Sequence, residues 1–138
     1  MRKEFLVYGS PAIENAEIEA VTDVLKSGWL GTGPKVAQFE EDFSQYKNIE
    51  HSVALNSCTA ALHLSILAAG IKAGDEVITT PLTFCATINA IIHAGATPVL
   101  ADIDLATMNI SAPDVERKIS DKTMAILPVH FAGRACDM

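Results

Sequence analysis

The sequence predicts an α/β fold with a mostly parallel sheet flanked by helices. In the second part of the chain, short β-type runs alternate with helical runs, which is the pattern of βαβ units. Two of the short runs, residues 76–79 and 125–129, are nearly continuous apolar stretches, as buried parallel strands are. Gly70, Gly74 and Gly95 fall where helices return to strands, so they predict C-caps and turns.

The first 50 residues predict two helices joined by an irregular loop. Apolar residues recur at near-helical spacing over about 13–27, with acidic residues toward the start, and a glycine follows. A second amphipathic helix is expected over about 35–46. Between them, residues 27–34 hold three glycines, a proline and the only tryptophan, so no regular element is expected there. We therefore separate a helical segment, residues 1–50, from an α/β domain, residues 51–138.

The sequence of the α/β domain predicts that strands and helices alternate. Strands are expected over residues 52–55, 76–79, 98–101 and 124–129, and helices over residues 60–69, 86–94 and 114–119. Because parallel strands end at one edge of a sheet, the loops that follow them converge there, and ligands of such folds bind at that edge. The segments placed at this edge are residues 56–60, 80–84 and 130–133.

The segment before the helix at residues 60–69 has the features of an anion site. An apolar strand runs there into Asn56, Ser57, Cys58 and Thr59 and then into the helix. The first N–H groups of a helix have no partner within it and carry partial positive charge, and the hydroxyls of Ser57 and Thr59 add donors. A phosphate ester would therefore bind without a Lys or Arg. The alternative is that Asn56 or Ser57 only caps the helix.

Two rings are placed at the same predicted edge. Phe84 would stack on a planar heteroaromatic ligand in the offset geometry that aromatic pairs prefer, or pack into the core at a helix start. His130 ends the last strand and would bond to the ligand, or be satisfied by backbone partners. His63, within an apolar helix, is expected to be a buried, hydrogen-bonded core residue.

The sequence gives weaker support to nucleophilic and metal sites. Cys58 would begin a helix, where thiol pKa values fall, so a thiol enzyme is an alternative, although the sequence indicates no His or Asn partner. Asp102 and Asp104 follow a strand, as acids or metal ligands do, but a solvated turn serves as well. We therefore expect no metal site.

Composition excludes several function classes. The 138 residues carry 10 Lys and Arg against 17 Asp and Glu, and the basic residues are scattered. Nucleic acids and anionic membranes need a clustered basic face, so neither is an expected partner. Hydrophobic residues make up 49% of the chain without a membrane-length run, which predicts a soluble protein with surface to bury in an oligomer. Three cysteines without metal-ligand spacing, and a start too short for a signal peptide, favour the cytoplasm.

Eight short motifs follow one another along the chain in an order that is typical of one enzyme family. They are Ser27–Pro34 (SGWLGTGP), Phe39–Glu40, Asn56–Leu64 (NSCTAALHL), Gly74–Thr79 (GDEVIT), Pro81–Phe84 (PLTF), Gly95–Val99 (GATPV), Asp102–Asp104 (DID) and Pro128–Gly133 (PVHFAG). In this order they resemble the sugar-nucleotide aminotransferases of the DegT/StrS type. These belong to the fold-type-I enzymes that use pyridoxal 5′-phosphate (PLP). The resemblance covers essentially the whole chain.

The resemblance implies that the chain is the N-terminal part of the large domain of a PLP-dependent aminotransferase. Residues 1–50 would supply helices and a substrate-side loop, and residues 51–138 part of the PLP-binding domain. Cys58 and Thr59 match positions whose amides and hydroxyl hold the PLP phosphate. Phe84 matches the aromatic residue that stacks on the pyridine ring.

The resemblance also implies a substrate pocket and its reaction. Trp29, Gly31, Thr32 and Gly33 match the loop that borders this pocket, and Ser57 matches a substrate-side contact in some members. Members more often have Thr where Gly31 stands. The implied reaction transfers an amino group from an amino acid, glutamate, to a nucleotide-linked keto-sugar, as in polysaccharide biosynthesis. Family members are homodimers with active sites at the subunit interface.

The family has two catalytic residues without a counterpart in this sequence. The aspartate that pairs with the pyridinium nitrogen and the Schiff-base lysine both come after the region matching residues 136–138. PLP chemistry needs both groups, so we expect the isolated chain to be inactive. Two alternatives remain: a PLP-dependent sugar dehydratase, in which histidine replaces the lysine, and a non-catalytic remnant that retains a dimer surface.

Overall fold

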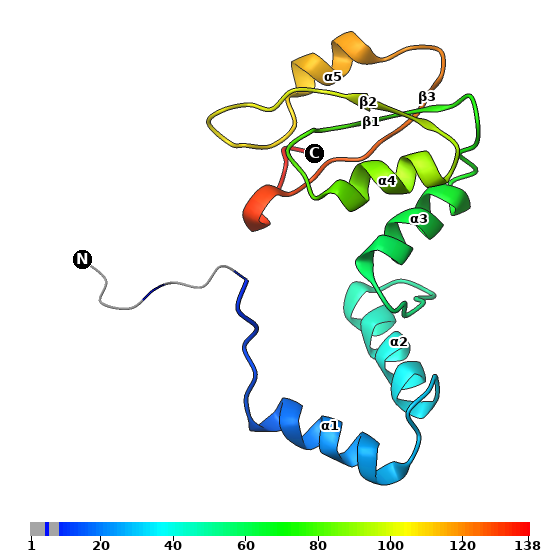
Figure 1. Ribbon diagram of the computed structural model, residues 1–138, viewed down its shortest axis with the longest axis vertical. Helices are drawn as coiled ribbons and strands as arrows, with labels where there is room; N and C mark the ends of the chain where they lie inside the picture. The colour runs from blue at the N-terminus through cyan, green and yellow to red at the C-terminus, as the bar shows by residue number, and fades with distance from the viewer. Residues whose placement is uncertain (1–4, 6–8) are drawn as a thin grey trace. The chain divides into compact units, whose positions relative to one another are not determined.

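The computed structural model describes Phe5 and residues 9–138, and it divides into two compact units, residues 1–54 and 55–138 (Figure 1). The expectation of no signal peptide rests on the start of the sequence, which, apart from Phe5, lies outside the described residues. Within the described ranges, no helix combines the length and the apolar character needed to span a bilayer.

The unit formed by residues 1–54 contains helices α1 (Asn15–Ser27) and α2 (Pro34–Lys47), and both were predicted. α1 begins with a capping box, in which the Glu17 carboxylate accepts the Glu14 N–H at 2.8 Å. It ends at Gly28, whose left-handed φ of 73° suits glycine. Pro34 opens α2, where the missing N–H costs nothing. Neither helix contains a buried residue, so packing within this unit adds little to their stability.

The unit formed by residues 55–138 is a layered α/β structure. Its elements are α3 (Cys58–Ala68), β1 (Glu76–Thr79), α4 (Cys85–His93), β2 (Thr97–Leu100), α5 (Ala112–Lys118), β3 (Thr123–Ile126) and the 3-10 turn η1 (Phe131–Gly133). The strands form one parallel sheet in the order β2-β1-β3, so β1 is central. Ile78 of β1 pairs with Val99 on one side and with Ile126 on the other. The predicted α/β fold with a parallel sheet is confirmed.

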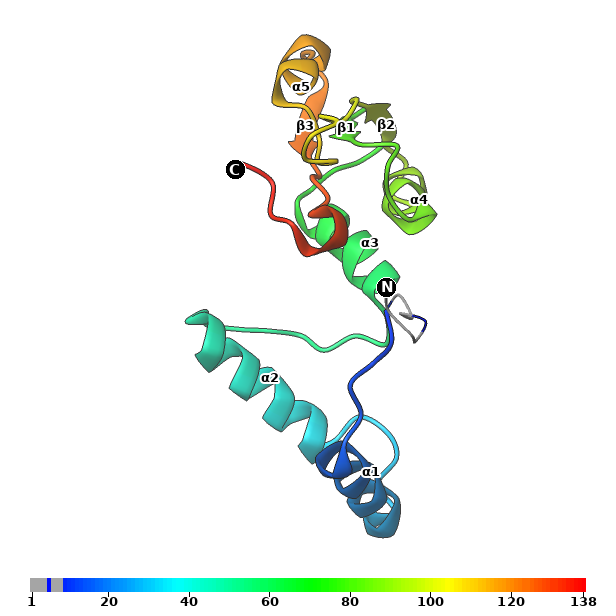
Figure 2. The same ribbon diagram turned by 90° about the vertical axis from the view of Figure 1, so that its left-hand side faces the viewer.

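Helices cover both faces of this sheet. In Figures 1 and 2, α5 lies on one side of the strands, and α3 and α4 lie on the other. The side chains of β1 alternate between two cores, because successive residues of a strand point to opposite faces. Val77 belongs to the same core as Ile66 of α3 and Ile91 of α4, whereas Ile78 packs with Val115 of α5. This double burial explains the continuous apolar character of β1.

The strand predicted over residues 52–55 is wrong. No described residue pairs its backbone with this segment in a ladder, and a strand is stable only when its backbone groups have partners. Instead, the Ser52 hydroxyl donates to the Glu40 carbonyl, and the Glu40 carboxylate accepts the Ala54 N–H at 2.8 Å. The segment is therefore held by α2.

The strand predicted over residues 124–129 forms but ends early. β3 stops at Ile126, although the Leu127 N–H still donates to the Ile78 carbonyl at 2.8 Å. Pro128 follows and has no N–H to continue the ladder. The chain therefore leaves the sheet just before His130.

Candidate functional site

The N-terminus of α3 presents free backbone donors. Ser57 is the N-cap residue, and its hydroxyl oxygen accepts the Ala60 N–H at 3.1 Å. The Ala61 N–H donates to the Ser57 carbonyl at 3.2 Å. Among the residues that the structure describes, none accepts the N–H of Cys58 or Thr59, and both residues are exposed. Two adjacent donors at the positive end of a helix are therefore available to an anion.

The cap and the anion site coexist at Ser57. The alternative that Ser57 caps the helix is confirmed, but the cap uses only the Ala60 N–H and leaves the amides of Cys58 and Thr59 free. As an acceptor, the Ser57 oxygen also keeps its own proton available for donation. The predicted substrate contact of Ser57 thus remains compatible with its cap, and it remains a prediction.

Phe84 does not pack into the core. It is the N-cap residue of α4, and 78% of its surface is exposed. The alternative of a core residue is therefore wrong, and the ring is free to contact a ligand. The two hydroxyls expected beside it are engaged within the loop. The Thr80 hydroxyl accepts the Leu82 N–H at 3.2 Å, and the Thr83 hydroxyl lies 2.8 Å from that of Thr87.

The two predicted cofactor segments share one edge of this unit. α3 and α4 pack against each other, and in Figure 1 both helices begin at the end of the unit where β1 and β2 finish. Cys58 and Thr59 start α3, and Phe84 precedes α4. Free N–H donors and an exposed aromatic ring therefore lie toward the same end of this unit, and their joint role in holding a ligand remains a prediction.

The third predicted segment, after β3, is tied down by a residue that sequence reasoning missed. Asn109 is buried, and its Nδ2 donates to the carbonyls of Arg134 and Ala135 at 3.1 and 3.0 Å. Its Oδ1 accepts the Phe131 N–H at 3.0 Å. The only signal in the sequence is that Asn109 follows Asp104 and Thr107 within a short segment, and these residue types favour turns.

The loop at residues 28–33 is folded around its tryptophan. The Trp29 Nε1–H donates to the Thr32 carbonyl at 3.1 Å, and the Trp29 N–H donates to the Ser27 hydroxyl at 3.1 Å. A Cβ at Gly33 would collide with the Trp29 ring, so glycine is required there by close approach. Gly31 meets no such contact. This loop belongs to the unit of residues 1–54, and its substrate role remains a prediction.

The carboxylates of Asp102 and Asp104 accept backbone N–H groups in turns, in agreement with the alternative that this segment is a solvated turn. Asp102 accepts its neighbour's N–H, and Asp104 accepts those of Ala106 and Thr107 at 2.8 and 3.0 Å. In the described part of the chain, no three His, Cys, Asp or Glu side chains are grouped as metal ligands are. His63 is half-buried and lies edge-on to His93, with ring centroids 6.1 Å apart.

A buried carboxylate joins α5 to the end of β2. Asp114 accepts the Asp102 N–H at 2.6 Å and pairs with Arg117 at 2.8 Å and with Lys118 at 3.1 Å. The Asp102 N–H first, and then the two cations, hold the pKa of the Asp114 carboxyl well below its usual value. The Lys118 ammonium also donates to the Leu100 carbonyl at 2.6 Å. These bonds hold α5 against the end of β2, and they engage both carboxylate oxygens of Asp114.

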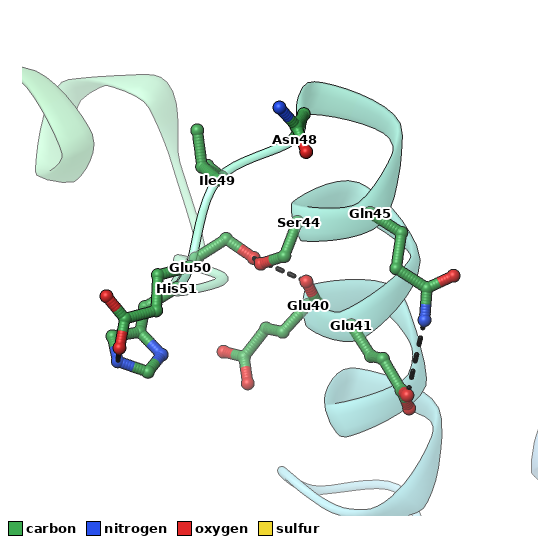
Figure 3. A pocket seen from close by; sticks show the side chains of 9 residues that line it. Glu40, Glu41, Ser44, Gln45, Asn48, Ile49, Glu50 and His51 are labelled. Carbon is green, nitrogen blue, oxygen red and sulfur yellow. Dashed lines mark hydrogen bonds and ion pairs between the residues drawn. The ribbon is translucent and has the colours of Figure 1, made fainter.

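A polar hollow lies on the unit of residues 1–54, where residues 48–52 fold back along α2 (Figure 3). Glu40, Glu41 and Glu50 line it, together with His51, which lies 3.3 Å from the Glu50 carboxylate. Both members of that pair are exposed. No predicted site residue lines this hollow.

The chain is similar to known proteins over nearly all of its length. Residues 11–138 match the DegT/DnrJ/EryC1/StrS aminotransferase family. The chain belongs to this family. The resemblance drawn from the motifs is therefore confirmed.

Relatives of this chain match nearly all of its length. The spore coat polysaccharide biosynthesis protein SpsC of Bacillus subtilis is 55% identical over 137 residues, covering 99% of this chain and 35% of the relative. A solved PLP form of Spr1654 from Streptococcus pneumoniae, named as a sugar aminotransferase, is 42% identical with a TM-score of 0.87, covering 96% of this chain and 34% of that one.

A third relative extends the comparison to another organism. PseC of Helicobacter pylori, an aminotransferase involved in the biosynthesis of pseudoaminic acid, is 32% identical with a TM-score of 0.84, covering 95% of this chain and 36% of that one. This chain thus spans about a third of the length of these relatives. The predicted cofactor is confirmed at the level of the family, since structures of relatives hold PLP or PMP.

Proposed function

We propose that this chain forms the cofactor cradle of a PLP-dependent sugar aminotransferase. The parent reaction would move an amino group from glutamate to a nucleotide-linked keto-sugar, in the cytoplasm and in a polysaccharide pathway. The observation that carries the proposal is the pairing, at one sheet edge, of the free N–H groups of Cys58 and Thr59 with the exposed ring of Phe84. The names of the relatives support the same reaction class.

The residues at this edge fit PLP chemically. Cys58 and Thr59 would donate their backbone N–H groups to the phosphate, and the Thr59 hydroxyl would add a third donor. Phe84 would stack on the pyridine ring and exclude water from one of its faces. When bound, PLP carries the amino group between substrates and acts as an electron sink.

The substrate-side residues are assigned by the family resemblance. Trp29, Gly31, Thr32 and Gly33 would border the sugar pocket, and Ser57 would donate its hydroxyl proton to the substrate. The proposal is supported by the Trp29 ring, which is 59% exposed although its N–H groups are engaged. Such a ring offers a flat surface for a sugar or a base.

We propose that the active form is a homodimer and that this chain supplies no amine for the Schiff base. Exposed apolar residues on α1 and α2, including Ile18, Val21 and Phe39, support an interface. Lys72 and Lys118, the described lysines of the unit of residues 55–138 that form ion pairs, contact Asp75 and Asp114. The lysine and the aspartate of the family would lie in the part of the relatives that this chain does not cover.

A titration with PLP tests the cradle. We expect the 138-residue chain to bind PLP, measured by equilibrium dialysis, and inorganic phosphate to compete. Thr59→Val should weaken binding, because valine has nearly the same size as threonine but lacks the hydroxyl. Ser65→Ala, at an exposed position of the same helix, should not weaken it. Equal affinity of both variants would contradict the phosphate assignment.

A chimera tests the reaction. Residues 1–138 would replace the matching N-terminal third of Spr1654, and the purified protein would be mixed with PLP and glutamate. We expect the chimera to convert bound PLP in the glutamate half-reaction, and borohydride to fix the cofactor covalently to the chimera but not to the 138-residue chain. Stoichiometric fixation at one lysine of the isolated chain would refute the absence of a Schiff-base lysine.

A further inference from the structure

We propose that Asn109 is a positioning residue of this site, which fixes the loop after β3 so that His130 presents its Nε2–H as a hydrogen-bond donor at the carboxyl edge of the sheet. This inference rests on the proposed function, because the site at that edge is the cradle described above. No family motif quoted above includes Asn109.

Asn109 holds the loop by three hydrogen bonds from a buried position. The side chain is 5% exposed, and its two Nδ2 protons are given to the carbonyls of Arg134 and Ala135. The Oδ1 atom accepts the Phe131 N–H at 3.0 Å. With both amide protons donated and the oxygen accepting, only one orientation of the amide satisfies the loop. Removing this side chain would leave the two carbonyls and the Phe131 N–H without these partners.

The backbone of Asn109 is itself fixed. After β2 the chain forms a narrow hairpin, in which Ile103 and Ile110 are bridged and the Asp104 N–H donates to the Asn109 carbonyl at 2.9 Å. Met108 takes a left-handed φ of 62° at the tip of this hairpin. A non-glycine residue in that region is strained, so the surrounding bonds must hold the turn. Asn109 is therefore presented to the loop by a rigid element.

The loop in turn fixes the ring of His130. The His130 Nδ1 accepts the Cys136 N–H at 3.1 Å, so this nitrogen carries a lone pair and no proton. The proton of the neutral ring must then be on Nε2. Cys136 is buried, and its thiol donates to the Val129 carbonyl at 3.3 Å, which keeps the two ends of the loop together. No described residue bonds to the His130 Nε2, and the residue is exposed.

The register of β3 places His130 at the candidate site. The Leu127 N–H bonds to the Ile78 carbonyl, and the Thr79 hydroxyl bonds to the Leu127 carbonyl. Because this pairing is parallel, the chain leaves β3 after Leu127 at the end of the sheet where β1 also finishes, and β1 leads through residues 80–84 to the start of α4. A fixed Nε2–H at this edge would serve an acceptor oxygen of the bound ligand.

Nitrogen-15 NMR of the 138-residue chain tests the positioning. We expect long-range proton–nitrogen correlations to show His130 protonated at Nε2 alone. Asn109→Asp keeps the acceptor for Phe131 but sets a carboxylate against two carbonyls, so it should give mixed His130 tautomers and faster exchange of the Cys136 amide. Asn89→Asp, at an exposed position of α4, is the matched control and should change neither signal.

Two results would overturn the positioning role. A wild-type chain with the His130 proton on Nδ1 would do so without any variant, even if Asn109→Asp fails to fold. A folded Asn109→Asp chain that keeps the wild-type tautomer would show that Asn109 contributes only to stability.

Substitutions of His130 test the donor, with PLP as the probe. An Asn amide places its oxygen near the position of Nδ1, whereas a Gln amide places a nitrogen near Nε2. We expect His130→Gln to bind PLP nearly as well as the wild type and His130→Asn to bind about tenfold more weakly. Equal affinities would refute the donor. A wild-type chain that does not bind PLP would refute the proposed function, while the tautomer still decides the positioning.

Discussion

Phe84→Ala separates ligand stacking from folding, because the ring is exposed. Since Phe84 is 78% exposed, only about a fifth of the roughly 200 Å² that a phenylalanine side chain can bury is covered. At about 25 cal/mol per Å², this area of about 40 Å² corresponds to about 1 kcal/mol of stability as an upper bound. The N-cap bond from the Thr87 N–H uses the Phe84 carbonyl and survives the substitution.

The same substitution should weaken PLP binding measurably. Loss of an offset-stacked ring costs about 0.5–1.5 kcal/mol, which is roughly a two- to twelvefold rise in Kd. The assay is a PLP titration beside a urea titration of the same sample. Ile92→Ala, at an exposed apolar position of α4, is the control and should leave PLP affinity unchanged.

Two outcomes would refute this reasoning. A fall of more than 2 kcal/mol in the free energy of unfolding would show that the ring is packed in solution, about twice the bound from its covered area. An unchanged Kd with an unchanged stability would show that the exposed ring contacts no cofactor.

Three further predictions concern α3, the core and acid stability. Ser57→Ala removes the acceptor of the Ala60 N–H and should cost about 0.5–2 kcal/mol, seen as faster hydrogen exchange of Ala60. Ile78→Ala empties a position that is 0% exposed and should lower the free energy of unfolding by about 2–5 kcal/mol in urea. Because the folded pKa of Asp114 is lowered, its stabilisation is present above the unfolded pKa of about 3.9 and is lost as the pH falls toward the folded pKa. Asp114→Asn should therefore reduce the fall of the thermal unfolding midpoint with decreasing pH, measured by recording this midpoint at a series of acid pH values.

Each of these predictions has a matched control. Ser57→Asp keeps the cap, so it should restore the helix while its charge weakens PLP binding. Met124→Ala, on β3 at 55% exposure, should cost far less than Ile78→Ala. Asp121→Asn, at an exposed position, should leave the fall of the midpoint with decreasing pH as it is in the wild type. If Asp121→Asn and Asp114→Asn behave alike, the bonds of Asp114 do not shape acid stability.

Elements set by neighbouring residues could be predicted from the sequence. α1 ends at Gly28 and α2 begins at Pro34, because caps depend on a few adjacent residues. β1 covers the predicted residues 76–79, since burial on both faces leaves an apolar run in the sequence. The predicted anion site at Cys58 lies at a helix start for the same local reason.

Features that depend on distant partners could not be predicted. A strand was expected at residues 52–55, but a strand needs a paired neighbour, and apolar composition does not reveal whether one is present. Asn109 was missed because its partners, from Phe131 to Ala135, lie 22 to 26 residues away. The exposure of Phe84 also depends on tertiary packing, which the sequence left open between ligand contact and core.

The unburied helices α1 and α2 limit what selection on the isolated chain can preserve. Ile18, Val21 and Leu25 are more than half exposed, so a polar residue at any of them meets almost no penalty in the folded chain. Directed evolution for soluble expression would therefore erode these positions first. A variant library sorted only for yield would enrich chains that purify well but have lost the apolar faces of α1 and α2.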